Sequence, residues 1–224
     1  MRRISLPTAP FCSGDPKKAK VLVIGHDPRL QDSHTLAGYA LFGDYYFKPV
    51  PTRKNELAKY QLAEAVYSYI GHLTSNKYSP TQIVLTNLCN DALPHAPQGK
   101  TVYIPEKKAR QGIDEIREIL NGSSIELIFA MSLQVNYWLQ QLGFYPAVDE
   151  FLSSAKPKER GVTNKPPYYN PTRGRAFTLI CGKQYQTTDQ RIVVPILHVK
   201  NWLLRGSFAK AYAESMEACI KALK

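Results

Sequence analysis

Four short apolar segments, spaced widely along the chain, constrain its fold more than any other feature of the sequence. They are rich in β-branched residues and almost continuously apolar, and they cover residues 20–25, 82–87, 126–131 and 191–198. A strand that is covered on both faces has this pattern, whereas a strand with one face in water alternates between apolar and polar residues. We therefore expect four buried strands.

The stretches between these segments carry helical signals. Residues 54–73 place apolar side chains at intervals that put them on one face of a helix. Start and stop signals predict three further helices, over residues 105–120, 132–142 and 207–223, and Ser132 is expected to cap the second of these. Strands that alternate with helices favour a parallel sheet between helical layers. The expected fold is α/β, a three-layer α/β/α sandwich with a central, mostly parallel four-stranded sheet.

The length of 224 residues, with 44% hydrophobic content, suffices to bury a full core, so one domain over residues 1–224 is expected. Residues 155–175 differ from the rest because they are rich in Pro, Gly, Asn, Lys and Arg and almost free of aliphatic side chains. Such a segment cannot bury a core of its own, so it predicts a basic surface loop or insertion. Its Tyr168 and Tyr169 suit nucleic-acid bases, although a solvated basic loop explains the composition equally well.

The charge points to a polyanionic partner. The chain has 29 Lys and Arg against 18 Asp and Glu, which gives a formal net charge of +11 and an isoelectric point near 9.4. Each phosphate that a protein neutralises releases condensed counterions, so such an excess favours nucleic acid as the partner. A basic surface that serves only solubility is the alternative.

The sequence predicts neither a cofactor nor a membrane anchor. The four cysteines lie far apart without a C-x-x-C pair, which predicts reduced, structural thiols and no metal site. The chain also has no G-x-x-x-x-G-K-[ST] phosphate loop. No apolar run approaches the roughly 18 residues of a membrane span, and no apolar leader segment follows Met1. We expect a monomeric, cytoplasmic protein without metal or cofactor.

Residues with useful chemistry follow three of the four strands. Gly25-His26-Asp27-Pro28 ends the first, Asn87 ends the second, and His198 ends the fourth. The carboxyl ends of parallel strands meet at one sheet edge, where open α/β sheets bind their ligands. Taken singly, Asp27 and Asn87 are ordinary turn formers and His198 an ordinary histidine at the edge of a core. Together they favour one crevice that holds a carboxylate, an amide and an imidazole.

These motifs, in this order, resemble the uracil-DNA glycosylase superfamily over residues 21–205. Gly25-His26-Asp27-Pro28 resembles the first motif of that family, which reads G-Q-D-P-Y in its best-known branch. Residues 37–44 resemble the G-x-P-F-x-G stretch that supplies a base-stacking aromatic in other branches. The resemblance implies an enzyme that flips a base out of the nucleic-acid stack and hydrolyses its bond to the sugar.

The resemblance implies a role for each matching position. Asp27 would orient a water molecule and stabilise the cationic sugar, and Asn87 would read the edge of the base. His198 would donate a hydrogen bond to the base oxygen as negative charge develops there. Phe42 would stack on the base, although an alignment on Gly43 puts Leu41 at that position.

The remaining implied contacts involve the backbone and the phosphates. Gly25 and His26 would bind the base through the first motif. Lys200 and Arg205 would contact the DNA backbone, which gives affinity without sequence choice. Trp202 would be a wedge into the DNA or an ordinary helix-packing residue. The family's His-Pro-Ser turn is replaced by His198-Val199-Lys200.

Three functions remain open from the sequence. The first is a monofunctional DNA N-glycosylase that removes uracil or another deaminated or damaged base during DNA repair. The second is a catalytically silent nucleic-acid-binding member of the same fold. The third is a nucleoside or nucleotide hydrolase, for which a carboxylate and an imidazole at strand ends serve equally well.

Overall fold

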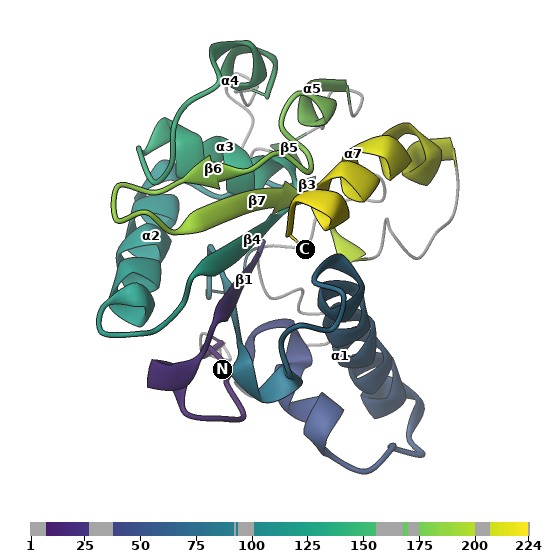
Figure 1. The fold of residues 1–224 in the computed structure, drawn as a ribbon. Coiled ribbons are helices and arrows are strands. Elements are labelled where there is room, and N and C mark those ends of the chain that lie inside the picture. Colours follow the sequence, from purple (N-terminus) through teal and green to yellow (C-terminus); the bar gives the residue numbers. More distant parts are fainter. Residues whose placement is uncertain are drawn as a thin grey trace.

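A buried sheet covered by helices forms the centre of the protein (Figure 1). The structure, a computed structural model, describes residues 8–26, 38–91, 93, 101–155, 168–169, 175–199 and 207–223. Side chains of the sheet and of the helices packed against it together form the core. Residues Val21, Leu22, Val23 and Ile24, for example, are completely shielded from solvent. This burial on both faces explains why the strand sequences do not alternate between apolar and polar residues.

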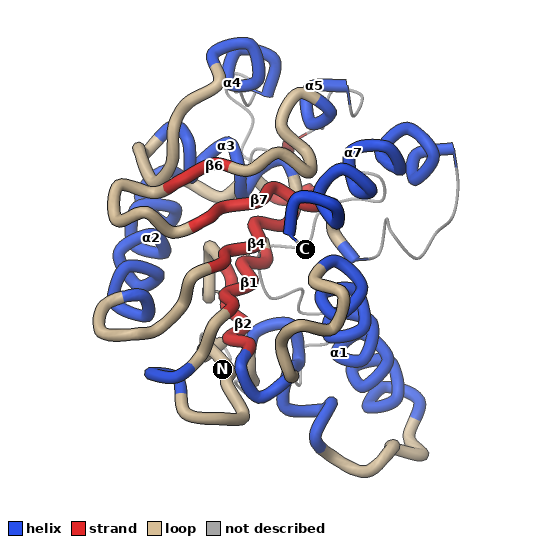
Figure 2. The backbone as a smooth tube through the Cα atoms, in the orientation of Figure 1, coloured by secondary structure: helices blue, strands red, loops and turns tan. Residues whose placement is uncertain are grey.

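Five strands make up the main sheet, in the order β2-β1-β4-β7-β6 (Figure 2). β1 (Val21–Gly25), β2 (Ile83–Asn87), β4 (Leu127–Met131) and β7 (Ile192–Ile196) run parallel. β6 (Tyr185–Gln186) pairs antiparallel with β7 at the edge. The mostly parallel sheet is confirmed, and each of the four expected strands is present. The sheet nevertheless has five strands and not four, because β6 was not expected. A two-residue edge strand such as β6 is too short to leave a pattern in the sequence.

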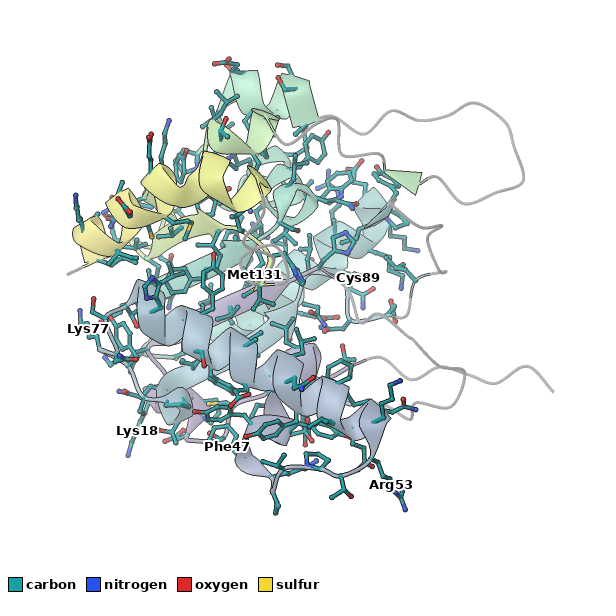
Figure 3. All side chains as sticks on the ribbon, turned by 90° about the vertical axis from the view of Figure 1, so that its right-hand side faces the viewer. Lys18, Phe47, Arg53, Lys77, Cys89 and Met131 are labelled. Atoms are coloured by element: carbon teal, nitrogen blue, oxygen red, sulfur yellow. The ribbon has the colours of Figure 1, made fainter. Side chains whose placement is uncertain are left out.

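Helices cover both faces of this sheet. α1 (Lys54–Leu73) and α7 (Ser207–Leu223) lie on one side, and α2 (Glu106–Leu120) and α3 (Leu133–Gln141) lie on the other (Figures 1 and 3). All four expected helices are confirmed to within one residue at each end. On α2, for instance, Ala109, Ile113, Ile116 and Leu120 are buried at helical spacing while charged side chains lie between them.

Smaller elements complete the described part of the chain. The two-stranded sheet pairs β3 (Thr101–Val102) with β5 (Tyr168–Tyr169). The short helical elements are η1 (Pro16–Lys18), η2 (Ala40–Phe47), η3 (Pro80–Gln82), α4 (Asp149–Ala155) and α5 (Arg175–Thr178). Most of the expected basic loop at 155–175 lies outside the described residues. No helix in the described ranges has the length and apolarity of a membrane span.

The order of the strands creates a switch point between β1 and β4. The chain leaves β1 toward α1 and returns in β2 on one side of β1, whereas β4 lies on the other side and leads into α3. Because α1 and α3 cover opposite faces, the connections diverge at the carboxyl ends of these two strands. A divergence of this kind opens the crevice in which open α/β sheets bind ligands.

The chain that follows β2 packs directly on α2, and Gly112 makes this approach possible. Alanine in place of Gly112 is expected to lower the free energy of unfolding by about 2 kcal/mol. Its methyl group would overlap the carbonyl oxygen of Leu88, which belongs to the backbone and cannot rotate away. Urea denaturation measures the change. Gly71→Ala in α1 is the control, because its methyl group meets only the end of the Asn76 side chain. Helix propensity should make that control neutral or stabilising by up to about 1 kcal/mol, so equal effects of the two substitutions would contradict the prediction.

Candidate functional site

The carboxyl edge of the parallel strands gathers the candidate residues that the structure describes. Gly25 lies beside Asn87 in the pairing of β1 with β2, and Met131 lies beside Ile196 in the pairing of β4 with β7. Figure 3 shows Lys18 and Lys77, which precede β1 and β2, at one end of the sheet, and Cys89 toward the other. His26 and His198 therefore follow their strands at the same edge as Asn87.

Asn87 is buried beside Gly25 with one end of its amide unpaired. The side chain is 2% exposed, and a methyl group on Gly25 would lie only 2.5 Å from Asn87 Oδ1. This oxygen has no hydrogen-bond partner in the part of the chain that the structure describes. A buried polar atom without a partner costs about 1–3 kcal/mol, so proteins seldom retain one without a use for it. Asn87 Oδ1 is therefore a candidate acceptor for a ligand.

Three contacts tie the chain after β2 to its surroundings. The backbone N–H groups of Leu88 and Cys89 donate to the carbonyl oxygens of Gly25 and His26, at 2.9 and 3.1 Å. Asp91 forms an ion pair with Lys108 on α2, and this hydrogen bond raises the pKa of Lys108. The backbone around Asn87 is thus fixed from both β1 and α2.

His26 is buried and contacts Gln134 of α3. The Nε2 atoms of the two side chains lie 2.6 Å apart, and Gln134 Oε1 accepts a hydrogen bond from the backbone N–H of Ile104 at 2.6 Å. Since its oxygen is occupied by a donor, Gln134 turns its NH2 group toward the imidazole. His26 Nε2 must then accept, which assigns the neutral tautomer with its proton on Nδ1.

The turn from β4 into α3 holds Ser132 in a strained conformation at the switch point. Its φ of 81° and ψ of 159° belong to a region that is essentially restricted to glycine. Ser132 occupies the expected N-cap position of α3, but its hydroxyl is buried without a partner among the described residues and makes no capping hydrogen bond. Asn136 holds the turn, because its Nδ2 donates to the carbonyl oxygens of Ala130 and Ser132 at 2.9 and 2.7 Å.

Replacement of Ser132 by glycine is expected to raise the free energy of unfolding by about 1–2 kcal/mol. The strain costs about 1–3 kcal/mol, the unpaired hydroxyl adds to it, and the freedom of glycine in the unfolded chain offsets about 1 kcal/mol. Urea denaturation tests this. Ser132→Ala, which removes the hydroxyl but keeps the strain, should stabilise less than glycine. A destabilising Ser132→Gly would mean that the hydroxyl has a structural partner.

The segment expected to supply a stacking aromatic is also strained. Leu41 and Phe42 of η2 both have positive φ, at 52° and 54°. The side chain of Leu41 lies against Gly25, since a methyl group on Gly25 would be 3.1 Å from Leu41 Cδ2. The ring of Phe42 instead packs edge-on to Tyr45, with the Lys59 ammonium 5.6 Å from its centroid. Of the two alternatives for the aromatic position, Leu41 is thus the one that touches the strand end.

His198 follows β7 between the buried residues Leu197 and Val199 and is itself partly buried. It lies three strand spacings from Asn87 in the sheet order, about 14 Å at the strand ends. A ligand that contacts both Asn87 and His198 must therefore extend across the ends of β1 and β4, which lie between them. Asp27, Lys200, Trp202 and Arg205 lie outside the described residues.

Sequence reasoning missed Gln134 and Ser132. Gln134 lies on the helix after β4, and its bond to His26 joins residues 108 positions apart, so no local pattern could reveal it. Serine is a common N-cap residue, so the sequence suggested an ordinary cap at Ser132 and gave no sign of its strained backbone.

The chain was compared with protein-family models and with curated protein sequences. No protein-family model matches the chain, and no curated protein matches its sequence. The resemblance to the uracil-DNA glycosylase superfamily therefore stays a prediction, carried by the first motif, Asn87 and His198.

Proposed function

We propose that this protein is a DNA glycosylase that flips a deaminated or damaged base, such as uracil, and hydrolyses its N-glycosidic bond. The proposal includes a uracil-DNA glycosylase-like, three-layer α/β/α fold, with α1 and α7 in one outer layer and α2 and α3 in the other. One observation carries it: the buried Asn87 amide, with its unpaired Oδ1, lies against the end of β1, from which the first motif continues. A site that reads the edge of a flipped base needs such a dry, fixed polar group.

In the proposed reaction, a water molecule adds to the sugar carbon and loses a proton to solvent. The electron pair of the bond between sugar and base moves to the base. Asp27 orients the water and stabilises the positive charge on the sugar, and His198 donates a hydrogen bond to the base oxygen that gains negative charge. Groups aimed at charge that develops only in the transition state accelerate the reaction. His26, neutral and held by Gln134, keeps a second imidazole beside the site without adding a positive charge there.

The charge of the chain supports DNA as the substrate. A net charge of +11 favours a polyanion. In this proposal Lys200 and Arg205, which follow His198 closely in the sequence, contact the phosphates. Such contacts give affinity that falls steeply with salt.

A base-release assay tests the proposal. The full chain is incubated with labelled oligonucleotides that carry one uracil, hypoxanthine or oxidised base, single- and double-stranded, and alkali then cleaves any abasic site. Release of a deaminated or damaged base, with binding that weakens as salt rises, is the expected result. Salt-sensitive binding without release from any substrate would instead identify a silent binding protein. Hydrolysis of free nucleosides without DNA binding would identify a nucleoside hydrolase.

A further inference from the structure

A chain of hydrogen bonds connects Asn87 to α2. Asn87 Nδ2 donates to Thr8 Oγ1 at 3.4 Å, Thr8 Oγ1 donates to Asn90 Oδ1 at 3.1 Å, and Asn90 Nδ2 donates to Glu115 Oε2 at 2.9 Å. We call these four residues the Asn87 relay. They come from three parts of the chain, since Thr8 precedes the sheet, Asn87 and Asn90 end and follow β2, and Glu115 lies on α2.

Antiparallel pairing brings Thr8 to this position. Phe11 and Leu85 exchange two backbone hydrogen bonds of 2.9 Å along the outer edge of β2. Because the two segments run in opposite directions, the chain from Phe11 back to Thr8 follows β2 forward toward Asn90. The backbone N–H of Thr8 then donates to the carbonyl oxygen of Asn90 at 2.8 Å. The Thr8 hydroxyl is thereby held by the backbone between the two amides.

Glu115 sets the direction of every bond in the relay. An ionised carboxylate can only accept hydrogen bonds, and its second oxygen already accepts from Gln111 Nε2 at 2.9 Å. Asn90 must therefore turn its Nδ2 to Glu115 and its Oδ1 to Thr8. The Thr8 hydroxyl donates to that oxygen, which leaves a lone pair to accept from Asn87 Nδ2. The end of the Asn87 amide that remains unpaired is consequently the acceptor, Oδ1.

We propose that Thr8, Asn90 and Glu115 are positioning residues that make Asn87 present an acceptor, and not a donor, at the carboxyl edge of β2. The consequence for specificity rests on the proposed function. Deamination converts a ring nitrogen that accepts hydrogen bonds into an N–H donor, both from cytosine to uracil and from adenine to hypoxanthine. A fixed acceptor binds that N–H and repels the ring lone pair of the undamaged base. The relay therefore selects deaminated bases against their parents.

The first test does not depend on catalysis. It follows the Asn87 side-chain amide by 1H–15N NMR in the full chain and in the variants Thr8→Val and Glu115→Ala, the second of which removes the acceptor for Asn90 Nδ2. Both variants should shift the signal and speed the exchange of its hydrogens at least tenfold. Thr8→Ser, which keeps the hydroxyl, should leave both as in the wild type. Glu118→Ala, which removes a carboxylate from an exposed position on the same helix, should do likewise. An Asn87 amide unchanged in both Thr8→Val and Glu115→Ala would overturn the relay, whether or not the chain acts on DNA.

The second test measures the specificity. Single-stranded oligonucleotides with one uracil are the substrate, and free uracil and free cytosine are competing inhibitors. The wild type should bind uracil at least tenfold more tightly than cytosine, and Thr8→Val should reduce this ratio at least tenfold while Thr8→Ser restores it. An unchanged ratio in Thr8→Val would overturn the specificity role. If the wild type releases no base from any substrate, the proposed function fails, and the NMR measurement still decides the relay.

Discussion

Alanine in place of Gly25 is expected to slow base release at least 100-fold while the protein stays folded. The added methyl group would lie 2.5 Å from Asn87 Oδ1 and 3.1 Å from Leu41 Cδ2, both closer than ordinary contacts. The Asn87 amide must then leave the end of β1, which removes the proposed base reader. A 100-fold loss corresponds to about 2.7 kcal/mol of transition-state stabilisation.

The structural cost of this substitution should be smaller than its effect on the rate. Overpacking of this kind lowers the free energy of unfolding by about 1–3 kcal/mol, out of a typical total of about 5–15 kcal/mol. Gly38→Ala is the matched control, because its methyl group meets no atom within 4 Å. Base-release rates and urea denaturation of both variants separate the two effects. Full activity in Gly25→Ala would show that Asn87 does not need its position against β1.

The substitutions Asp27→Asn and His198→Ala are each expected to lower the rate of base release by about 100-fold or more. In the proposed mechanism, each substitution removes a charge or a hydrogen bond that is directed at the transition state, and losses of this size are typical of such groups. Asn would keep the size of Asp27 but would supply no negative charge to the cationic sugar. Alanine at 198 would leave the departing base oxygen without the proposed donor.

These losses should affect the chemical step and not the binding of DNA. Both variants are expected to retain a uracil-free oligonucleotide as tightly as the wild type, since phosphate contacts dominate that affinity. His72→Ala and Asp149→Asn are matched controls, because both residues are exposed and belong to helices, α1 and α4, and not to the segments that directly follow the strands. Wild-type rates in Asp27→Asn or His198→Ala would remove that residue from the proposed mechanism.

The main elements of the fold could be predicted because their signals are local. The apolar run 20–25 became β1, and the pattern over 54–73 became α1, since burial on both faces or on one helical face selects the residue type at each position. The edge strand β6 escaped prediction because its two residues are held only by β7, a neighbour in space.

The candidate site could be predicted only in part. The strand ends placed Gly25, His26, Asn87 and His198 at one edge, as their positions after apolar runs indicated. The side-chain partners could not be foreseen, because they join distant parts of the sequence. Thr8 and Asn90, for example, are 82 residues apart.

The sequence by itself determined which segments become strands and helices, and hence which residues follow the strands, because hydrophobic periodicity and turn chemistry depend on near neighbours in the chain. Only the tertiary structure decided the order β2-β1-β4-β7-β6, which sets Asn87 against Gly25 and places Ser132 at the switch point. It also decided which end of the Asn87 amide stays unpaired, because that depends on a hydrogen-bond chain that begins at Glu115. Hydrogen bonds between side chains depend on distance and direction in space, and those follow only after the strands have packed.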